Sequence, residues 1–225
     1  MAALYTLHRL LSKLSGGRAR IVPYAIYAQP LGSASLSSVR DDPETVTTLC
    51  LTGDSSTNDF PRPGPVTAAR FAAGAECYAT LVKGQFAGHI WIARKRYDED
   101  EVRCEYVLAD AQRSVWDFDV YVVPAYRLGR ALARMWKAVD ANLRTDGVAW
   151  SFSRISLFNR GSISTHERLG AVRTGHAIFV VIGSIQLAFL SASPFVHASL
   201  GESRRPTILL REPPTNATQG KQQPD

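Results

Sequence analysis

The sequence predicts an α/β (α+β) fold in which helices lie on both faces of a mixed central sheet. From Glu76 to Val123, short apolar runs separated by turn residues suit a succession of strands. The apolar period then changes to 3.6 residues, which predicts a helix over about 127–144. A strand, a short helix and two further strands follow. Strands that alternate with helices in this order are typical of domains with a helix-covered sheet.

The composition suits a globular protein. A chain of 225 residues with 45% hydrophobic residues is long enough for one domain with appendages, or for at most two small domains. Its cysteines, Cys50, Cys77 and Cys104, are odd in number and form no CxxC pair, so the sequence signals neither a disulfide framework nor a metal site. The simplest compartment is a reducing cytosol. We therefore expect a cytoplasmic protein without a metal.

The positive charge belongs to the start of the chain. The formal net charge is +6, and residues 1–40 hold five basic residues and no acid. The remaining 21 basic residues nearly balance 20 acids, so the body is close to neutral. A nucleic-acid-binding body would be basic over a whole face. The sequence thus predicts no nucleic-acid partner.

Residues 1–20 are predicted to form an N-terminal amphipathic helix. Leucines recur at helical spacing over residues 2–14, and Gly16 and Gly17 end the pattern. Arg9 and Lys13 lie opposite the leucines and also exclude a secretory signal. We prefer a helix docked on the body. The alternative is a weak contact between residues 2–14 and a membrane surface.

The first half of the body reads as strands with one helix. In chain order the predicted elements are a strand at Ile21–Gln29, a loop region over 30–66 with a short strand at Val46–Leu51, a helix at Pro65–Ala73, strands at Cys77–Val82 and Phe86–Ile92 around a Lys83-Gly84 turn, a charged loop at Lys95–Glu101, and strands at Val102–Leu108 and Val115–Val123.

The second half contains both predicted helix–strand alternations. In order, a helix spans Arg127–Arg144, a strand Val148–Phe158 and a short helix Ser162–Leu169, and strands at Ala177–Ile182 and Ile185–Leu190 flank Gly183-Ser184. The longest apolar stretch, Ala177–Leu190, is shorter than the ~20 residues that span a membrane. Residues 212–225, rich in Pro and Gln, are predicted to form a disordered tail.

The junction from Val122 to Arg130 is a candidate anion site. A strand that runs into a helix presents unpaired backbone N–H groups and the positive end of the helix dipole, which suit a pyrophosphate. Gly129 permits close approach of the backbone. Arg127, Arg130, Arg134 and Lys137 recur at steps of three and four, so they share a helix face that could hold further phosphate charge or simply face solvent.

Two motifs in this order resemble those of the GNAT acyl-CoA N-acyltransferase superfamily. Val122, Pro124 and Arg127 match V-x-P-x-x-R of the first motif. The second motif, N-x-x-A/S-x-x-x-Y-x-x-L-G, is matched by Asn159, Ser162, Leu169 and Gly170. The resemblance covers about residues 76–190, and we assign residues 21–200 to the acyltransferase domain.

The resemblance implies a splayed sheet that holds acetyl-CoA or another acyl-CoA as co-substrate. It also implies direct attack of an amine, from a small molecule or a protein, on the thioester. The residues implied in acyl-CoA binding are Val122, Val123, Arg127, Leu128, Gly129, Arg130, Asn159 and Ser162. The chain could also form a homodimer.

The chain departs from the family pattern in the phosphate loop and at the general acid. Arg130 and Leu132 stand where the family has Gly and Gly/Ala. His166 stands where the family has its general-acid Tyr. An imidazolium can protonate a thiolate, so His166 is the candidate acid. The alternative is a histidine packed on the helix surface.

The candidate general bases lie on the strand before the phosphate junction. Asp117 and Asp119 alternate with apolar residues, which places both carboxylates on one face unless a bulge intervenes. We rank Asp119 first, then Asp117, with Glu105 on the preceding strand as an alternative. The backbone N–H of Val122 or Val123 is the implied oxyanion donor.

A second class of function fits the same sequence. The altered phosphate loop and the missing Tyr also suit a non-catalytic acyl-CoA-binding or partner-binding module that has kept the fold. Turnover of acyl-CoA distinguishes this alternative from the N-acyltransferase.

Overall fold

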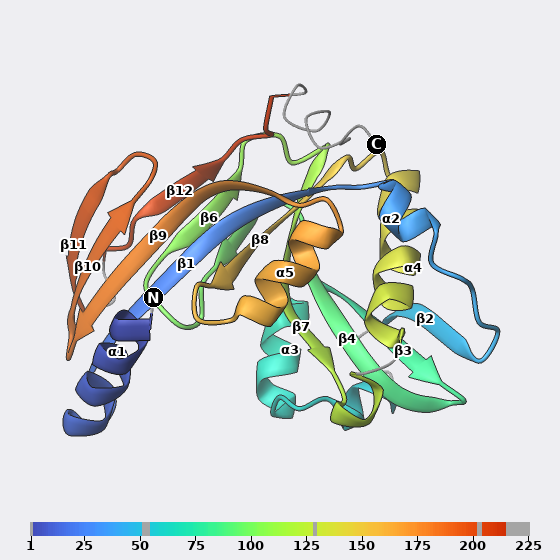
Figure 1. The fold of residues 1–225 in the computed structure, drawn as a ribbon, viewed down its shortest axis with the longest axis horizontal. Helices are drawn as coiled ribbons and strands as arrows, with labels where there is room; N and C mark the ends of the chain where they lie inside the picture. The colour runs from blue at the N-terminus through green and yellow to red at the C-terminus, as the bar shows by residue number, and fades with distance from the viewer. Residues whose placement is uncertain (1, 51–54, 128–129, 202–203, 215–225) are drawn as a thin grey trace. The chain divides into compact units, whose positions relative to one another are not determined.

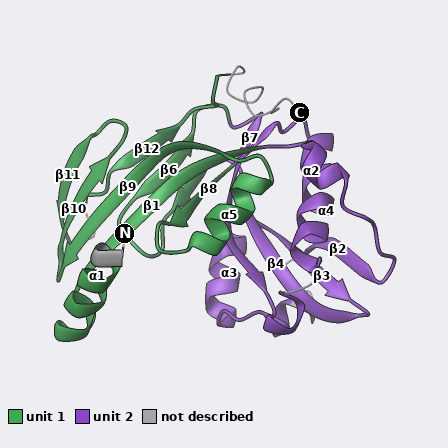
Figure 2. Cartoon of the chain, in the orientation of Figure 1, with its two compact units in different colours: residues 1–29, 95–110, 152–225 green, residues 30–94, 111–151 purple. Residues whose placement is uncertain are grey.

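The computed structural model describes residues 2–50, 55–127, 130–201 and 204–214. The chain divides into two compact units (Figure 2). Unit 1 comprises residues 1–29, 95–110 and 152–225, and unit 2 comprises residues 30–94 and 111–151. Because the chain passes between the units repeatedly, neither unit is one continuous segment. The predicted domain limits, 1–20 and 21–200, stay predictions.

Unit 1 contains a largely antiparallel sheet built from both ends of the chain. Its strands lie in the order β11–β10–β9–β1–β8 (Figure 1). Their bounds are Val196–Leu200, Ile185–Leu190, Val172–Ile182, Ala19–Pro30 and Trp150–Ser156. The strand pairs β1–β9, β9–β10 and β10–β11 are antiparallel. The sequence predicts β1, β8, β9 and β10, but not β11.

A smaller sheet covers one face of β9 and β10. It consists of β5 (Arg96–Asp98), β6 (Glu105–Leu108) and β12 (Thr207–Leu210) in the order β12–β6–β5. The Arg103 N–H donates to Gln186 Oε1 over 2.9 Å, and Gln186 Nε2 donates to Arg103 O over 2.7 Å. β5 lies within the segment predicted as a charged loop, and three residues are too few to show an apolar pattern.

Helices α1 (Ala2–Leu14) and α5 (Arg160–Arg168) accompany the same sheet. From α5, Ile163 packs against Ala25 and Tyr27 of β1. Helix α1 approaches through Tyr5, whose ring lies 5.1 Å from that of Phe158. The predicted helix 2–14 is therefore confirmed and lies against its unit, but its leucine face is not the face that docks.

Unit 2 contains an antiparallel sheet in the order β7–β4–β3–β2. The strands are β2 (Thr45–Cys50), β3 (Glu76–Val82), β4 (Gln85–Ala93) and β7 (Ser114–Val122). Lys83 and Gly84 both have positive φ angles, as the tight turn between β3 and β4 requires. All four strands and this turn are predicted by the sequence.

Helices lie on both faces of the unit 2 sheet. On one face, Asn142 Oδ1 of α4 (Ala131–Thr145) accepts a hydrogen bond from Tyr78 Oη over 2.6 Å. On the other, Phe71 of α3 (Gly64–Ala72) packs against Trp91 with 4.9 Å between ring centroids. Short helical turns complete the unit: α2 (Ala34–Ser37), η1 (Ser55–Asp59) and η2 (Pro124–Tyr126). The predicted class, a mixed sheet with helices on both faces, is confirmed.

One predicted helix boundary needs correction, and one segment forms strands that the sequence did not predict. The helix expected from Arg127 begins at Ala131, because Pro124 opens a separate 3₁₀ turn, η2, before it. The segment after Leu190 forms β11 and β12. Most of the predicted tail 212–225 lies outside the described residues.

Candidate active site

Strand β7 carries a bulge where the candidate bases lie. Trp91 of β4 pairs with Phe118, and His89 pairs with Tyr121, so Asp119 and Val120 together oppose one residue of β4. Asp119 has a φ of +46°, which is rare outside glycine. A bulge of this kind changes the direction of the side chains on either side of it.

The bulge also brings β4 and β7 close together. A Cβ placed on Gly88 would lie 2.3 Å from Tyr121 O and 3.2 Å from Val122 Cα. Only glycine permits this approach of the two backbones. Gly88 is therefore required for the local geometry of the site.

Asp119 lies in a cluster of basic side chains. Arg62 Nε donates to Asp119 Oδ2 over 3.0 Å, and Arg70 donates to the same oxygen. His89 Nε2 lies 3.9 Å from that oxygen. Burial raises the pKa of Asp119, but the contacts with His89, Arg62 and Arg70 outweigh it and lower the pKa well below the ordinary value. A carboxylate held in this way is a weak base.

Sequence reasoning did not identify the partners of Asp119. Arg62 and Arg70 lie 57 and 49 positions away in the chain, and no local pattern connects them to β7. His89 is fully buried within an aromatic environment, with the ring of Phe60 4.6 Å away. Its place in the mostly apolar strand β4 predicts burial and gives no signal of chemistry.

Asp117 has a different environment from Asp119. Its Oδ2 accepts a hydrogen bond from Ser151 Oγ over 2.7 Å, and the residue is buried. Burial raises the pKa of Asp117 to about 7. The two aspartates reach different partners, so the expectation that they act from one face does not hold at the bulge. Asp117 can exchange a proton near neutral pH.

Glu105, the alternative base, belongs to unit 1. It accepts a hydrogen bond from Arg96 over 3.1 Å and another from Thr207. These contacts join neighbouring strands of the smaller sheet. The structure therefore gives Glu105 a place in a surface ion pair of unit 1.

The segment after β7 makes several contacts within its own unit. The Val123 N–H donates to Ala87 O over 2.9 Å, so this amide is not available to an oxyanion. This corrects one of the two expected donors. Arg127 is exposed, and its Nε donates to Val122 O over 2.9 Å. That contact fixes the turn before α4. It uses only Nε, and the guanidinium group has further N–H donors.

Helix α4 begins with properties that suit an anion. Arg130 is its N-cap residue, the Arg130 side chain makes no capping hydrogen bond, and the first turn of the helix contains no acid. Leu128 and Gly129 lie outside the described residues. The stripe predicted to extend this positive charge is only partly available, because Arg134 binds Asp42 and Lys137 binds Asp41. Both basic residues instead hold the loop before β2.

The second group of predicted site residues lies in unit 1, at the start of α5. Asn159 caps this helix, and its Oδ1 accepts from the Ser162 N–H over 3.1 Å. An asparagine at this position satisfies a backbone donor at the start of the helix. Ser162 lies in the first turn. Both residues therefore have a structural role within α5.

His166 makes a hydrogen bond that defines its tautomer. Its Nδ1 lies 2.9 Å from Ser162 O, and a carbonyl oxygen can only accept, so Nδ1 carries the proton. Nε2 of the neutral ring then has a lone pair. Burial lowers the pKa of His166, and the bond to Ser162 opposes this more weakly. The neutral, proton-accepting form of the imidazole is thus favoured.

The structure groups the predicted site residues by unit. Asp117, Asp119, Val122, Val123, Arg127 and Arg130 lie in unit 2, and Asn159, Ser162 and His166 lie in unit 1 (Figure 2).

Among the described residues, no group of three His, Cys, Asp or Glu is placed to hold a metal ion. In the same part of the chain, no helix has the length and apolar character needed to cross a membrane.

Comparison with solved structures identifies the fold. A conserved protein of unknown function from Staphylococcus epidermidis superposes with a TM-score of 0.53 at 12% identity, over 78% of this chain and 67% of that one. A tandem GNAT protein from the clavulanic acid biosynthesis pathway superposes with a TM-score of 0.50 at 15% identity, over 72% of this chain and 54% of that one. The chain has a GNAT-like fold.

A further solved structure is similar over most of the chain, and the sequence comparisons found no match. A GNAT-family acetyltransferase from Novosphingobium aromaticivorans is also similar, with 17% identity and a TM-score of 0.47, over 73% of this chain and 65% of that one. The chain spans about half the length of the tandem GNAT protein and about two thirds of the Novosphingobium protein. No family model and no curated protein sequence matches the chain.

Proposed function

We propose that this chain is an N-acyltransferase that moves an acyl group, acetyl in the simplest case, from acyl-CoA to an amine. The observation that carries the proposal is the bulged strand β7, which leads through η2 to the start of α4, where Arg130 makes no side-chain cap and the first turn has no acid. On a GNAT-like fold this is where a pyrophosphate would bind. The acceptor is a small-molecule or protein amine, and no metal takes part.

The described residues fit an acyl-CoA in a specific way. The backbone N–H groups at the start of α4 and the guanidinium groups of Arg127 and Arg130 are donors for phosphate oxygens. Acyl-CoA supplies the thioester whose C–S bond is broken. Arg134 and Lys137 are not part of this donor set, because Asp42 and Asp41 already bind them.

His166 is our candidate for proton transfer. Its Nε2 would accept the proton that the amine loses as the C–N bond forms. The resulting imidazolium would then return that proton to the leaving thiolate as the C–S bond breaks. One residue thus serves as base and acid in turn, which its tautomer favours. Asp117 is the second candidate base, because its pKa of about 7 lets it hold a proton at neutral pH.

Calorimetry with acetyl-CoA and longer acyl-CoA tests the binding step. We expect micromolar binding by the wild type and at least tenfold weaker binding by Arg127→Ala. The matched control is Arg168→Ala, since Arg168 is also exposed and also donates through Nε to a backbone carbonyl, that of Ser164. Equal binding by Arg127→Ala and the wild type, or no binding at millimolar CoA, would overturn the placement of the phosphates.

A screen of amines for release of free CoA tests the reaction. We expect turnover with at least one amine, and a loss of 10²-fold or more in kcat for His166→Gln, which is the range of general acid–base catalysis. An unchanged kcat in that variant would exclude His166 from proton transfer.

Specific observations favour the second candidate, a non-catalytic acyl-CoA-binding module. Asp119 is held by two arginines, and the Val123 amide is already bonded. Tight acyl-CoA binding without CoA release from any amine would select this alternative.

We also propose that the protein works in the cytoplasm. Cys50, Cys77 and Cys104 are buried thiols, and none of them forms a disulfide within the described residues. Thiols of this kind persist in a reducing compartment.

A further inference from the structure

One face of the unit 1 sheet is apolar over three strands. Cross-strand partners point to the same side of a sheet, so the pairings of β9, β10 and β11 define a three-by-three grid. We call it the β9–β11 face. Its rows are Ile178, Phe189 and Val196; Val180, Leu187 and Ala198; and Ile182, Ile185 and Leu200.

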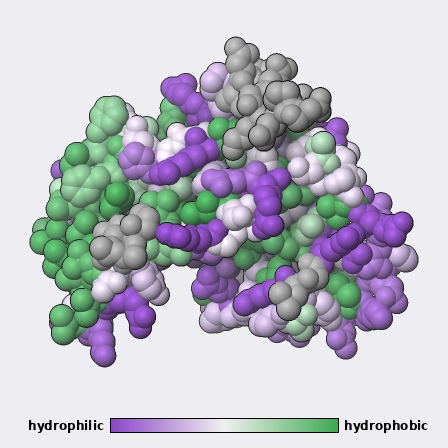
Figure 3. Space-filling model, in the orientation of Figure 1, coloured by the Kyte–Doolittle hydropathy of each residue, from purple (hydrophilic) through white to green (hydrophobic). Residues whose placement is uncertain are grey.

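The β9–β11 face is open to solvent. Ile182 is 59% exposed and Leu200 is 68% exposed, and Ile185, Leu187, Phe189 and Val196 are exposed as well. Figure 3 shows the hydrophobic colour gathered over β10 and β11. The other side of these strands is buried, and it contains Gln186, Ala188 and Ser199. An apolar outer side on strands whose inner side is already buried is typical of strands covered on both faces.

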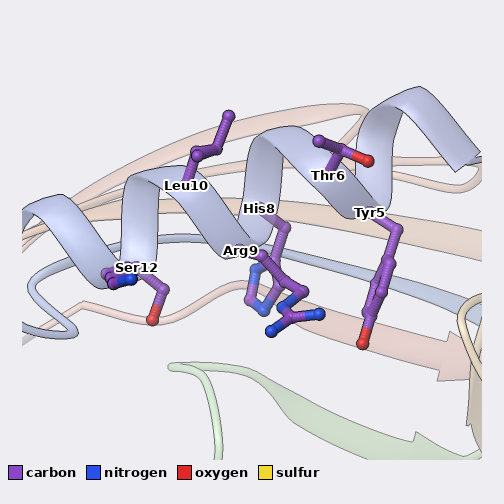
Figure 4. Close-up of a pocket in the computed structure, with 7 residues that line it drawn as sticks. Tyr5, Thr6, His8, Arg9, Leu10 and Ser12 are labelled. Carbon is purple, nitrogen blue, oxygen red and sulfur yellow. The ribbon is translucent and has the colours of Figure 1, made fainter.

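Helix α1 extends this apolar surface. Tyr5, His8 and Ser12 lie on one side of α1, and Leu10 points away from them (Figure 4). Leu10 is 53% exposed, and Leu7 and Leu14 are exposed with it. The segment after α1 borders the face, because Gly183 N–H, in the turn between β9 and β10, donates to Arg18 O over 2.7 Å.

The charge pattern sets this surface apart from an ordinary solvent-facing one. From Thr174 to Gly201 the sequence contains no Asp, Glu, Lys or Arg. Strands that face water normally alternate apolar with polar or charged residues. Charges placed on an exposed strand also prevent association with other chains. Their absence over three successive strands indicates that water is not the usual neighbour of this face.

The size of the surface matches an interface between proteins. The exposed apolar side chains of α1 and the β9–β11 face present on the order of 1,000 Å² to solvent, above the roughly 300–600 Å² of the largest patch on a typical monomer. A stable complex of standard size buries about 800 Å² on each partner. The area is therefore enough for a stable dimer.

We infer that the β9–β11 face, together with the exposed leucines of α1, is the interface of a homodimer, in which this surface packs against the same surface of a second copy. In an isologous pair the patch is self-complementary around a two-fold axis. Leu187 stands at the centre of the grid, so it lies nearest that axis. The two sheets would pack about 10 Å apart, like the halves of a sandwich.

A lipid surface is the competing occupant, since α1 carries Arg9 and Lys13. The outer edge of β11 argues against it. That edge presents backbone N–H and C=O groups without a strand partner among the described residues. Hydrocarbon cannot satisfy such groups, whereas water at the rim of a protein interface can. The homodimer inference does not depend on the proposed function.

Light scattering after size exclusion on the full chain tests the inference. We expect the wild type to have twice the 24.7 kDa mass of one chain, and Leu187→Lys to have the mass of one. The matched control is Leu209→Lys, because Leu209 of β12 is exposed to a similar degree but lies outside the β9–β11 face. It should stay dimeric. A monomeric wild type at well above micromolar concentration, or a dimeric Leu187→Lys, would overturn the inference.

Two further measurements remove ambiguity. If Leu187→Lys does not fold, Leu187→Cys replaces it: oxidation should join two copies through residue 187, and failure to cross-link would contradict the central place of this residue. Flotation with vesicles of phosphatidylserine and phosphatidylcholine tests whether a lipid surface binds the face instead. A wild type that is monomeric and floats with these vesicles would show that lipid covers the face instead.

Discussion

At the residue scale, the environment of each carboxylate decides its chemistry more than its place in the sequence. Asp117 and Asp119 stand two positions apart on β7. Burial raises the pKa of one to about 7, and arginines lower the pKa of the other. The sequence could predict that both lie on this strand. It could not predict their contacts with Arg62 and Arg70, since these residues lie 57 and 49 positions from Asp119 and no local pattern connects them to β7.

Asp117 should make stability depend on pH. Its folded pKa is raised to about 7 from an ordinary 3.8, so its contribution is fully present below pH 3.8 and is lost as pH rises through 7. Asp117→Asn removes the ionisation. We expect its free energy of unfolding, relative to the wild type, to rise by a few kcal/mol between pH 5 and pH 8. Urea unfolding at both pH values measures this, with the exposed Asp41→Asn as a control that should show no such trend.

His166 should make stability depend on pH in the opposite direction to Asp117. Its folded pKa is lowered from 6.5, so the unfolded chain binds a proton more readily, and stability falls as pH drops through about 6.5. His166→Gln should weaken this acid-induced loss. Urea unfolding at pH 5.5 and 7.5 compares the variant with His176→Gln, an exposed residue of β9. Identical pH dependence in the wild type and in His166→Gln would show that the imidazole is not desolvated.

At the element scale, the bulge of β7 and Gly88 opposite it form one structural feature, because each depends on the close approach of the two backbones. The sequence predicts both strands, because alternation and turn residues are local signals. It does not predict the bulge, since an extra residue changes register without changing composition. The strand β5 escapes prediction because three residues are too few to show a pattern, and the late start of α4 escapes it because η2 comes before that helix. The N-terminal helix was predictable, but the face it docks through was not.

Gly88→Ala should disrupt the close packing of β4 against the bulge of β7. The new Cβ would meet the backbone oxygen of Tyr121, which cannot move without displacing β7. We expect a loss of roughly 2–4 kcal/mol in the free energy of unfolding. Gly64→Ala is the matched control, since nothing lies within 4 Å of its added Cβ and its effect should be within about 0.5 kcal/mol. Equal stability of the two variants in urea would contradict the close approach of β4 and β7.

At the scale of the whole molecule, connectivity links the two compact units. The chain leaves and re-enters each unit, and β8 itself begins with residues of unit 2 and continues in unit 1. The length of the sequence predicts one domain with appendages or at most two small domains, but no local pattern marks where the units divide. The pairing of β1 with β9 was equally hidden, because it joins segments from opposite ends of the sequence.

Because both units contain part of β8, we expect the two units to unfold cooperatively. We expect one calorimetric transition at a fixed protein concentration, with equal calorimetric and van't Hoff enthalpies per cooperative unit. Differential scanning calorimetry of the full chain measures both. Two resolved transitions would mean that each unit is stable without the other, despite the strand they share.

The pairing of β1 with β9 also has a consequence for synthesis on the ribosome. β1 ends at Pro30 and β9 begins at Val172, so 142 residues must be translated before these two strands can meet. At about 5–20 residues per second this takes roughly 7–30 s. During that interval the apolar first strand has emerged but lacks the neighbour that will cover its edge, and the nascent chain is a natural client for chaperones.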